Sequence, residues 1–201
     1  LEFLSLVGST MGMLKIGWPV MGNAANMAVR RSVYLDVFST LEKRASASGD
    51  DVFLLHELAA HKNAIAVLHG PGGFVKTQPQ QNLKALLWQR MRWASKAKLY
   101  TNKTAVAVAL LVFVVNVFLL FLAVFSLANA DAALSFWLLF AVKLLTDFVL
   151  LNSFGSYFSQ RINLIYFVLQ EFLNLLYIPL IAVFSQIFGY RWKGRNYDVR
   201  I

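Results

Sequence analysis

Three long apolar segments occupy the second half of the chain, at residues 105–128, 132–152 and 164–188. Each is long enough for a helix to cross the hydrocarbon core of a bilayer, which takes about 20 residues. The hydrophobic content of 58% and the mean hydropathy of +0.58 also exceed what a soluble domain usually carries. The sequence therefore predicts a multi-pass membrane protein with about three transmembrane helices.

The positive charge of the chain is concentrated beside the first apolar segment. The formal net charge is +9, and residues 76–103 account for +7 of it, residues 190–201 for +3 and residues 104–189 for −1. A basic cluster of this kind binds anionic lipid headgroups and marks the cytoplasmic side of a membrane. We therefore expect residues 1–103 in the cytoplasm, membrane lipids as partners, and no nucleic acid as a partner.

The C-terminal tail conflicts with a simple three-span topology. Three spans would send it to the side opposite the basic cluster, yet it carries Arg191, Lys193 and Arg195, which the positive-inside rule keeps in the cytoplasm. Either the stronger first cluster alone sets the orientation, or one segment does not fully span. Residues 132–152, which include Lys143 and Asp147, are the most plausible such segment.

Composition excludes several kinds of chemistry. The chain has no cysteine, which removes disulfides, thiolate metal sites and cysteine nucleophiles. His56 and His61 are five positions apart and so do not share a helix face as zinc-protease histidines do. We predict no metal site, and we interpret His69 as a surface or hydrogen-bonded residue. The chain opens at Leu1 inside an apolar stretch, and we interpret it as a fragment whose upstream part is missing.

The first half of the chain shows alternating helix and loop signals. We expect a surface or interfacial helix and loop at 1–20, followed at 22–34 by a small-residue loop that leads into a strand or short helix. A helix should then run from Ser48 to about Lys62. After it we expect a short strand at 66–68, a loop at 70–81 and a helix at about 82–100. Ser48 followed by Asp51 matches a capping box at the start of the helix that we expect from Ser48 to about Lys62.

Two short motifs carry residues suited to sugar transfer. SGDDVFLL contains Asp50 and Asp51, and WQRMRW contains Gln89, Arg92 and Trp93. On a helix the last three share a face. A carboxylate can accept the proton of an attacking hydroxyl, a guanidinium can bind a diphosphate through two parallel hydrogen bonds, and an indole can position a sugar ring.

This combination resembles the inverting family 2 membrane glycosyltransferases, which include the hyaluronan, chitin and cellulose synthases. The resemblance rests on the acidic pair and on Q-x-x-R-W, and FGYRWKGR at 188–195 is similar to the tail that follows the last span in bacterial relatives. It implies an α/β fold plus transmembrane helices, with the C-terminal part of a GT-A domain at 1–103, membrane helices at 104–189 and a basic tail at 190–201. It also implies a bacterial inner membrane with a cytoplasmic active site.

The resemblance further implies roles for individual residues. Asp51 would be the catalytic base with Asp50 as its neighbour, and the loop 22–30, with Asn23 and Asn26, would lie near the acceptor. The donor would be a UDP-sugar and the acceptor a growing glycan. Mg²⁺ or Mn²⁺ would be bound by a D-x-D motif earlier in the chain, because none occurs here. This fragment alone would then be inactive.

Other interpretations of the same residues stay open. Asp51 could only cap a helix, and the tryptophans among the lysines and arginines could anchor an interfacial helix. The chain could be a noncatalytic membrane module, such as a transporter part, or a transferase acting on a polyprenyl-phosphate lipid. Lys143, Asp147 and Glu171 could line a polar path for a glycan or hold the helices together.

Overall fold

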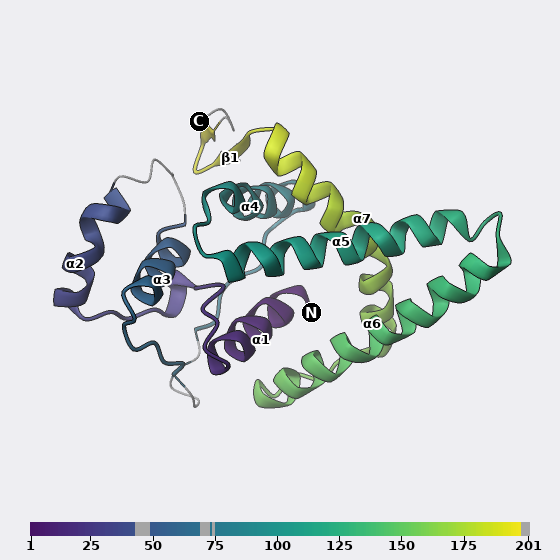
Figure 1. Ribbon diagram of the computed structural model, residues 1–201, viewed down its shortest axis with the longest axis horizontal. Coiled ribbons are helices and arrows are strands. Elements are labelled where there is room, and N and C mark those ends of the chain that lie inside the picture. The colour runs from purple at the N-terminus through teal and green to yellow at the C-terminus, as the bar shows by residue number, and fades with distance from the viewer. Residues whose placement is uncertain (43–48, 69–72, 74, 198–201) are drawn as a thin grey trace. The chain divides into compact units, whose positions relative to one another are not determined.

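The protein is mostly helical, with 71% of its described residues in helices. The computed structural model describes residues 1–42, 49–68, 73 and 75–197 (Figure 1). The α-helices are α1 (Glu2–Lys15), α2 (Arg31–Glu42), α3 (Asp50–Ala60), α4 (Leu83–Ser95), α5 (Lys103–Phe125), α6 (Ala130–Tyr157) and α7 (Leu164–Ile187). Two short 3₁₀ helices, η1 (Ala24–Asn26) and η3 (Lys96–Leu99), and two strands, β1 (Tyr190–Trp192) and β2 (Arg195–Tyr197), complete the described elements.

The chain forms two compact units. One contains Leu1–Ser9 and Leu110–Leu180, and the other contains Thr10–Ala109 and Ile181–Ile201. The first unit holds most of the three apolar helices, and the second holds both sequence motifs and the C-terminal tail.

The prediction of three long apolar helices is confirmed. α5, α6 and α7 are each long and apolar enough to cross a membrane. Buried side chains from all three form one core, which consists of Leu119, Leu122, Phe136, Phe140 and Leu175. Many other leucines, valines and phenylalanines on these helices point outward, as expected where lipid replaces water as the surroundings.

Asparagines begin the later helices. Asn82, Asn102 and Asn129 each accept a hydrogen bond from the backbone N–H three residues on, at 2.9–3.0 Å. Asn163 accepts from the N–H groups of Ile165 and Tyr166 at 3.0 and 3.2 Å. Each side chain thereby satisfies backbone donors that a helix leaves unpaired at its first turn.

The second unit has a smaller core between α2 and α3. Val37 from α2 packs with Leu54 and Leu58 from α3. Every residue of α3 from Val52 to Leu58 is buried, so this helix is enclosed around its circumference. Such a helix lacks the polar face of an ordinary surface helix.

Several sequence predictions were wrong in detail. The α/β fold with a GT-A domain is not seen, because the described residues form only the two-stranded sheet of the tail. Residues 66–68 form no strand, because a strand needs a partner for its ladder bonds. α6 continues to Tyr157, five residues beyond the predicted end of its span at 152. The segment 22–34 does lead into a helix, which is one of the two predicted outcomes. Ser48, 69–72 and the end of the tail lie outside the described residues.

The start of α3 also differs from the predicted capping box. Gly49 is the N-cap residue, with a φ of 114°, and Asp51 lies in the first turn. Two acidic residues at this end, Asp50 and Asp51, complement the positive end of the helix dipole.

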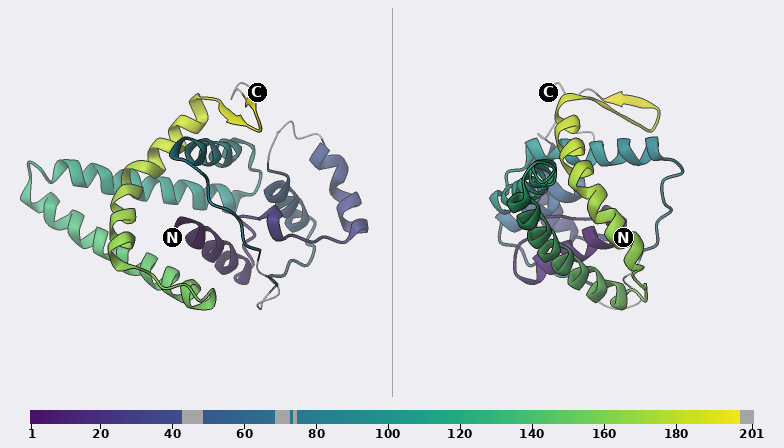
Figure 2. Two further views of the ribbon diagram at one scale, coloured as in Figure 1. Left: turned by 180° about the vertical axis from the view of Figure 1, so that it is seen from behind. Right: turned by 90° about the vertical axis from the view of Figure 1, so that its right-hand side faces the viewer.

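The tail forms a tight antiparallel hairpin against α4. Tyr190 pairs with Tyr197, and Trp192 pairs with Arg195. Lys193 and Gly194, which make the turn, have φ values of 49° and 78°, as a two-residue hairpin turn requires. β1 packs on α4, and Figure 2 shows the two elements adjacent in both of its views.

Candidate functional site

Asp51 is held from two sides in the first turn of α3. Its Oδ2 accepts a hydrogen bond from the backbone N–H of Ala24 at 3.1 Å, and its Oδ1 accepts one from the N–H of Val52 at 2.9 Å. Nζ of Lys96 lies 4.0 Å from Oδ1, and the two side chains are 8% and 21% exposed for Lys96 and Asp51. The carboxylate is therefore fixed in orientation while one of its edges stays accessible.

Lys96 of η3 lies near this carboxylate, and Arg92 at the end of α4 is influenced by its charge. Burial lowers the pKa of Lys96, and the charge of Asp51 opposes that shift. Burial likewise lowers the pKa of Arg92, with opposing contributions from Tyr190 and Asp51. Burial and the Asp51 charge together raise the pKa of Tyr100 to about 12. The structure thus brings Asp51 and Arg92 into one electrostatic cluster, with Lys96 and Tyr100 as further members.

The C-terminal hairpin covers the other side of Arg92. The guanidinium carbon lies 5.1 Å from the centre of the Trp192 ring, within the range of a cation–π interaction. Burial raises the pKa of Tyr190, although the charge of Arg92 and a hydrogen bond with Ser95 act in the opposite direction. The tail therefore supports the arginine of the second motif.

Gln89 and Trp93 of the second motif both contact Arg90. Nη1 of Arg90 donates a hydrogen bond to Oε1 of Gln89 at 2.7 Å, and the Arg90 guanidinium lies 4.3 Å from the Trp93 ring centre. The helical spacing correctly places these residues on α4. The spacing alone does not show that both side chains contact Arg90, which lies between Gln89 and Trp93 in the sequence.

The loop 22–30 lies against the start of α3. Asn23 Oδ1 accepts a hydrogen bond from the N–H of Ala25 at 3.0 Å and caps η1, and Asn26 Nδ2 donates to the carbonyl of Gly73. A Cβ at Gly22 would lie 3.0 Å from the carbonyl oxygen of Asp51. Both asparagines thus shape the loop, and the loop contacts the predicted base through Ala24.

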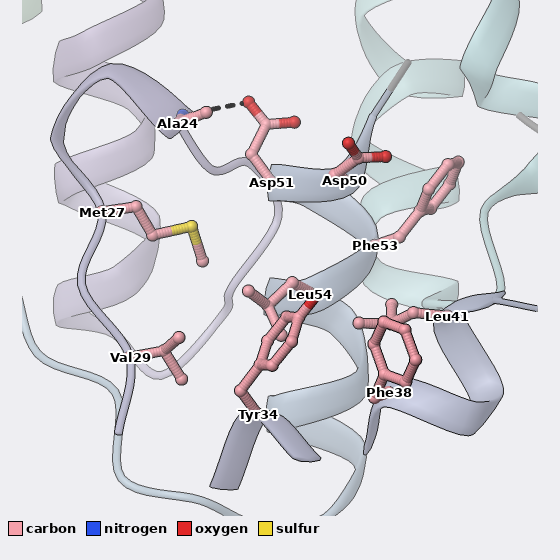
Figure 3. Close-up of a pocket in the computed structure, with 10 residues that line it drawn as sticks. All are labelled: Ala24, Met27, Val29, Tyr34, Phe38, Leu41, Asp50, Asp51, Phe53 and Leu54. Atoms are coloured by element: carbon pink, nitrogen blue, oxygen red, sulfur yellow. Dashed lines mark hydrogen bonds between the residues drawn. The ribbon is translucent and has the colours of Figure 1, made fainter. Parts of the chain in front are cut away.

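A cavity of about 440 Å³ opens beside the two carboxylates. Figure 3 shows Asp50 and Asp51 at one end of it and apolar side chains along the rest. The other lining residues are Ala24, Met27, Val29, Tyr34, Phe38, Leu41, Phe53 and Leu54. Asp50 is exposed. The cavity therefore combines an acidic end with walls on which an apolar or ring-shaped group can pack.

Among the described residues there is no group of three histidine, aspartate or glutamate side chains that could hold a metal ion. The cation Lys96 lies 4.0 Å from Oδ1 of Asp51. Among the histidines, Nε2 of His56 lies 3.0 Å from the carbonyl of Val20, and Nδ1 of His61 lies 2.9 Å from that of Glu57. His69 lies outside the described residues.

Sequence reasoning missed Lys96, Tyr100 and the support that Trp192 gives to Arg92. Lys96 follows Arg92 by four positions, so helical spacing places both on one face, and this signal was available. The contact with Trp192 joins segments far apart in the chain and had no such signal. Comparisons of the chain with models of protein families, with curated proteins and with solved structures found no match.

Proposed function

We propose that this chain forms the acceptor and base side of an inverting glycosyltransferase that works at a membrane. The observation that carries the proposal is Asp51, which lines the cavity, lies 4.0 Å from Nζ of Lys96 and acts electrostatically on Arg92. The two motifs that resemble family 2 transferases lie far apart in sequence, and their charged residues act on one another in space. Three helices that are apolar enough to span a bilayer suit a product or acceptor at the membrane.

In the proposed reaction an acceptor hydroxyl attacks the anomeric carbon of a UDP-sugar. The bond between that carbon and the diphosphate oxygen breaks, and the hydroxyl proton passes to Oδ1 of Asp51. Oδ2 is engaged by the N–H of Ala24, which orients the carboxylate. Arg92 provides positive charge for the leaving diphosphate. Mg²⁺ or Mn²⁺ would require ligands from another part of the enzyme, and no step here depends on it.

The acceptor would occupy the cavity beside Asp50 and Asp51. Its aromatic and aliphatic walls can pack against the apolar faces of a sugar ring. A lipid-linked acceptor would use the same walls for its hydrocarbon part. The proposal therefore covers both a glycan and a polyprenyl-phosphate acceptor.

A purely structural role for Asp51 is the main competing interpretation. Its hydrogen bond from Ala24 anchors the loop 22–30 to α3, which a noncatalytic membrane module would also need. Loss of fold and loss of chemistry must therefore be separated in any test.

The test measures the release of nucleoside diphosphate from each of a panel of UDP-sugars. The enzyme source is membranes from cells that express the complete open reading frame. Asp51→Asn can keep an oxygen toward the N–H of Ala24 but cannot take a proton, and its amide nitrogen replaces the Oδ1 that accepts from Val52. The folded state of this variant is therefore checked by its thermal unfolding. We expect turnover to fall at least about a hundredfold, with unchanged donor binding. Asp50→Asn is the matched control, because it changes the adjacent exposed carboxylate, and we expect a smaller loss.

Two results would overturn the role assignment. Normal turnover by Asp51→Asn would remove Asp51 as the base, and a greater loss in Asp50→Asn would transfer the role to Asp50. Arg92→Lys should also lower turnover, because a single ammonium does not replace a two-pronged guanidinium. If no UDP-sugar is cleaved by folded protein with acceptor supplied, the membrane-module interpretation replaces this one.

A further inference from the structure

The end of α7 is hydrogen-bonded to the segment that precedes α5. Nζ of Lys98 donates to the carbonyl of Gln186 at 3.0 Å, and Nε2 of Gln186 donates to the carbonyl of Ala94 at 3.1 Å. Just beyond, Trp192 lies against Arg92. All of these residues belong to the same compact unit. The chain thus leaves this location along α5 and returns to it at the end of α7.

A chain that leaves one face of a membrane and returns to it has crossed an even number of times. The three apolar helices α5, α6 and α7 lie between Lys98 and the tail, and three complete crossings would separate the partners of these hydrogen bonds by the thickness of the hydrocarbon core, about 30 Å. We infer that the tail lies on the same membrane face as α4. Of the three apolar helices, α5 and α6 then cross the membrane completely. α7 enters the membrane and leaves it on the face where α4 lies.

The proline inside α7 supports its assignment as the helix that does not cross. Pro179 removes a backbone hydrogen bond, which bends a helix. The boundary between the two compact units falls next to it, after Leu180.

Hydropathy and charge agree with this assignment. Mean hydropathy in the most apolar part of each helix falls from 3.1 in α5 to 2.0 in α6 and 1.8 in α7. The connection between α6 and α7 carries Arg161, which prefers the cytoplasmic side. With two crossings, Arg191, Lys193 and Arg195 of the tail also lie on the side of the basic cluster at 76–103. The conflict between span number and the positive-inside rule then disappears.

The absence of cysteine from the sequence makes a single-cysteine accessibility experiment direct. Four exposed positions report on the four relevant places: Lys76 before α4, Leu127 between α5 and α6, Gln160 between α6 and α7, and Asn196 in the hairpin. Each is replaced by cysteine in the full chain. Sealed cells are treated with a membrane-impermeant maleimide, and the labelling is compared with that of permeabilised cells.

We expect Lys76→Cys, Gln160→Cys and Asn196→Cys to be labelled only after permeabilisation, and Leu127→Cys to be labelled in sealed cells. Labelling of Asn196→Cys on the side opposite Lys76→Cys would overturn the inference. A second outcome is that Asn196→Cys and Lys76→Cys are labelled on one side while Gln160→Cys is labelled on the side of Leu127→Cys. That outcome would overturn the assignment of α7 and make α6 the incomplete span.

A cross-link tests the same inference without relying on accessibility. In a chain that carries both Lys98→Cys and Gln186→Cys, a short bismaleimide should join the two cysteines. When the chain is then cleaved between these positions, the cross-link should hold the two fragments together and shift their electrophoretic mobility. The pair Lys98→Cys and Leu127→Cys is the matched control and should not be joined. Failure of the first pair to cross-link in folded protein, with both cysteines shown to be reactive, would contradict the shared face.

Discussion

At the scale of single residues, Gly49 determines how the acidic pair is presented. Its φ of 114° is open to glycine and costly for other residues. A Cβ here would also lie 2.8 Å from Cδ of Lys96 and 2.8 Å from Cε2 of Phe53. Glycine thus allows Lys96 to pass close to the start of α3, where it faces Asp51.

We predict that Gly49→Ala lowers the free energy of unfolding by about 2–4 kcal/mol, because backbone strain and overpacking add. Thermal unfolding in detergent, followed by tryptophan fluorescence, measures the loss. Gly194→Ala is the matched control, since its φ is 78° but no atom lies within 4 Å of the added Cβ, and it should lose only the strain contribution. Equal losses in the two variants would show that the contact with Lys96 and Phe53 is unimportant.

The residue types of the candidate site could be read from the sequence only in part. Asp51 and Arg92 were predicted from their motifs, and their mutual electrostatic influence is present in the structure. Gln89 and Trp93 instead interact with Arg90, because the spacing of a helix defines faces but not which neighbour a flexible side chain chooses. Their roles toward a substrate stay predictions.

At the scale of elements, the start of α4 depends on Asn82. Its Oδ1 accepts a hydrogen bond from the N–H of Ala85 at 2.9 Å. α4 has no fully buried residue, so local interactions carry a larger share of its stability than they would in a core helix. The cap therefore matters for the helix that presents Arg92.

We predict that Asn82→Ala destabilises the second unit by about 1 kcal/mol, whereas Asn82→Asp keeps the cap and changes stability by a few tenths. Hydrogen exchange of the amides in the first turn of α4 reports the local effect directly. Exchange should become faster in Asn82→Ala than in Asn82→Asp. Identical exchange rates in both variants would show that tertiary contacts, not the cap, hold this turn.

Helices were predictable at this scale, and the strands were not. Long apolar segments indicated α5 to α7 closely, because hydropathy is a local signal. The hairpin of β1 and β2 was missed, since its strands have three residues each and offer too little alternation to detect. The predicted strand at 66–68 failed for the complementary reason that a strand needs a partner.

At the scale of the whole molecule, an ion cluster joins α6 to α7 inside the apolar unit. Nζ of Lys143 lies 2.7 Å from Oδ2 of Asp147, one turn away on α6, and also pairs with Glu171 of α7. Asn174 Nδ2 donates to Glu171 Oε1 at 3.3 Å. The sequence left open whether these residues line a polar path or hold the helices together. The cross-helix partner favours a role in holding the helices together.

We predict that Lys143→Met lowers the free energy of unfolding by about 3–5 kcal/mol, because it leaves two acids without their cation in an apolar setting. The triple variant Lys143→Met, Asp147→Leu, Glu171→Leu removes all three charges and should recover most of that loss. Thermal unfolding in lipid nanodiscs compares them. If the triple variant is as unstable as the single one, the cluster contributes more than mutual charge compensation.

The sequence by itself determined that this chain has three membrane-compatible helices, a basic segment before the first, and an acidic and a basic motif in its first half. These follow from hydropathy, charge and short-range spacing, which act within one element. Only the tertiary structure decided that Asp51 meets Lys96, that the tail packs on Arg92, and that the end of α7 returns to the start of α5. Such contacts depend on how whole helices pack. The local patterns of each segment do not specify which distant segment it contacts, because many different pairings are compatible with the same local patterns.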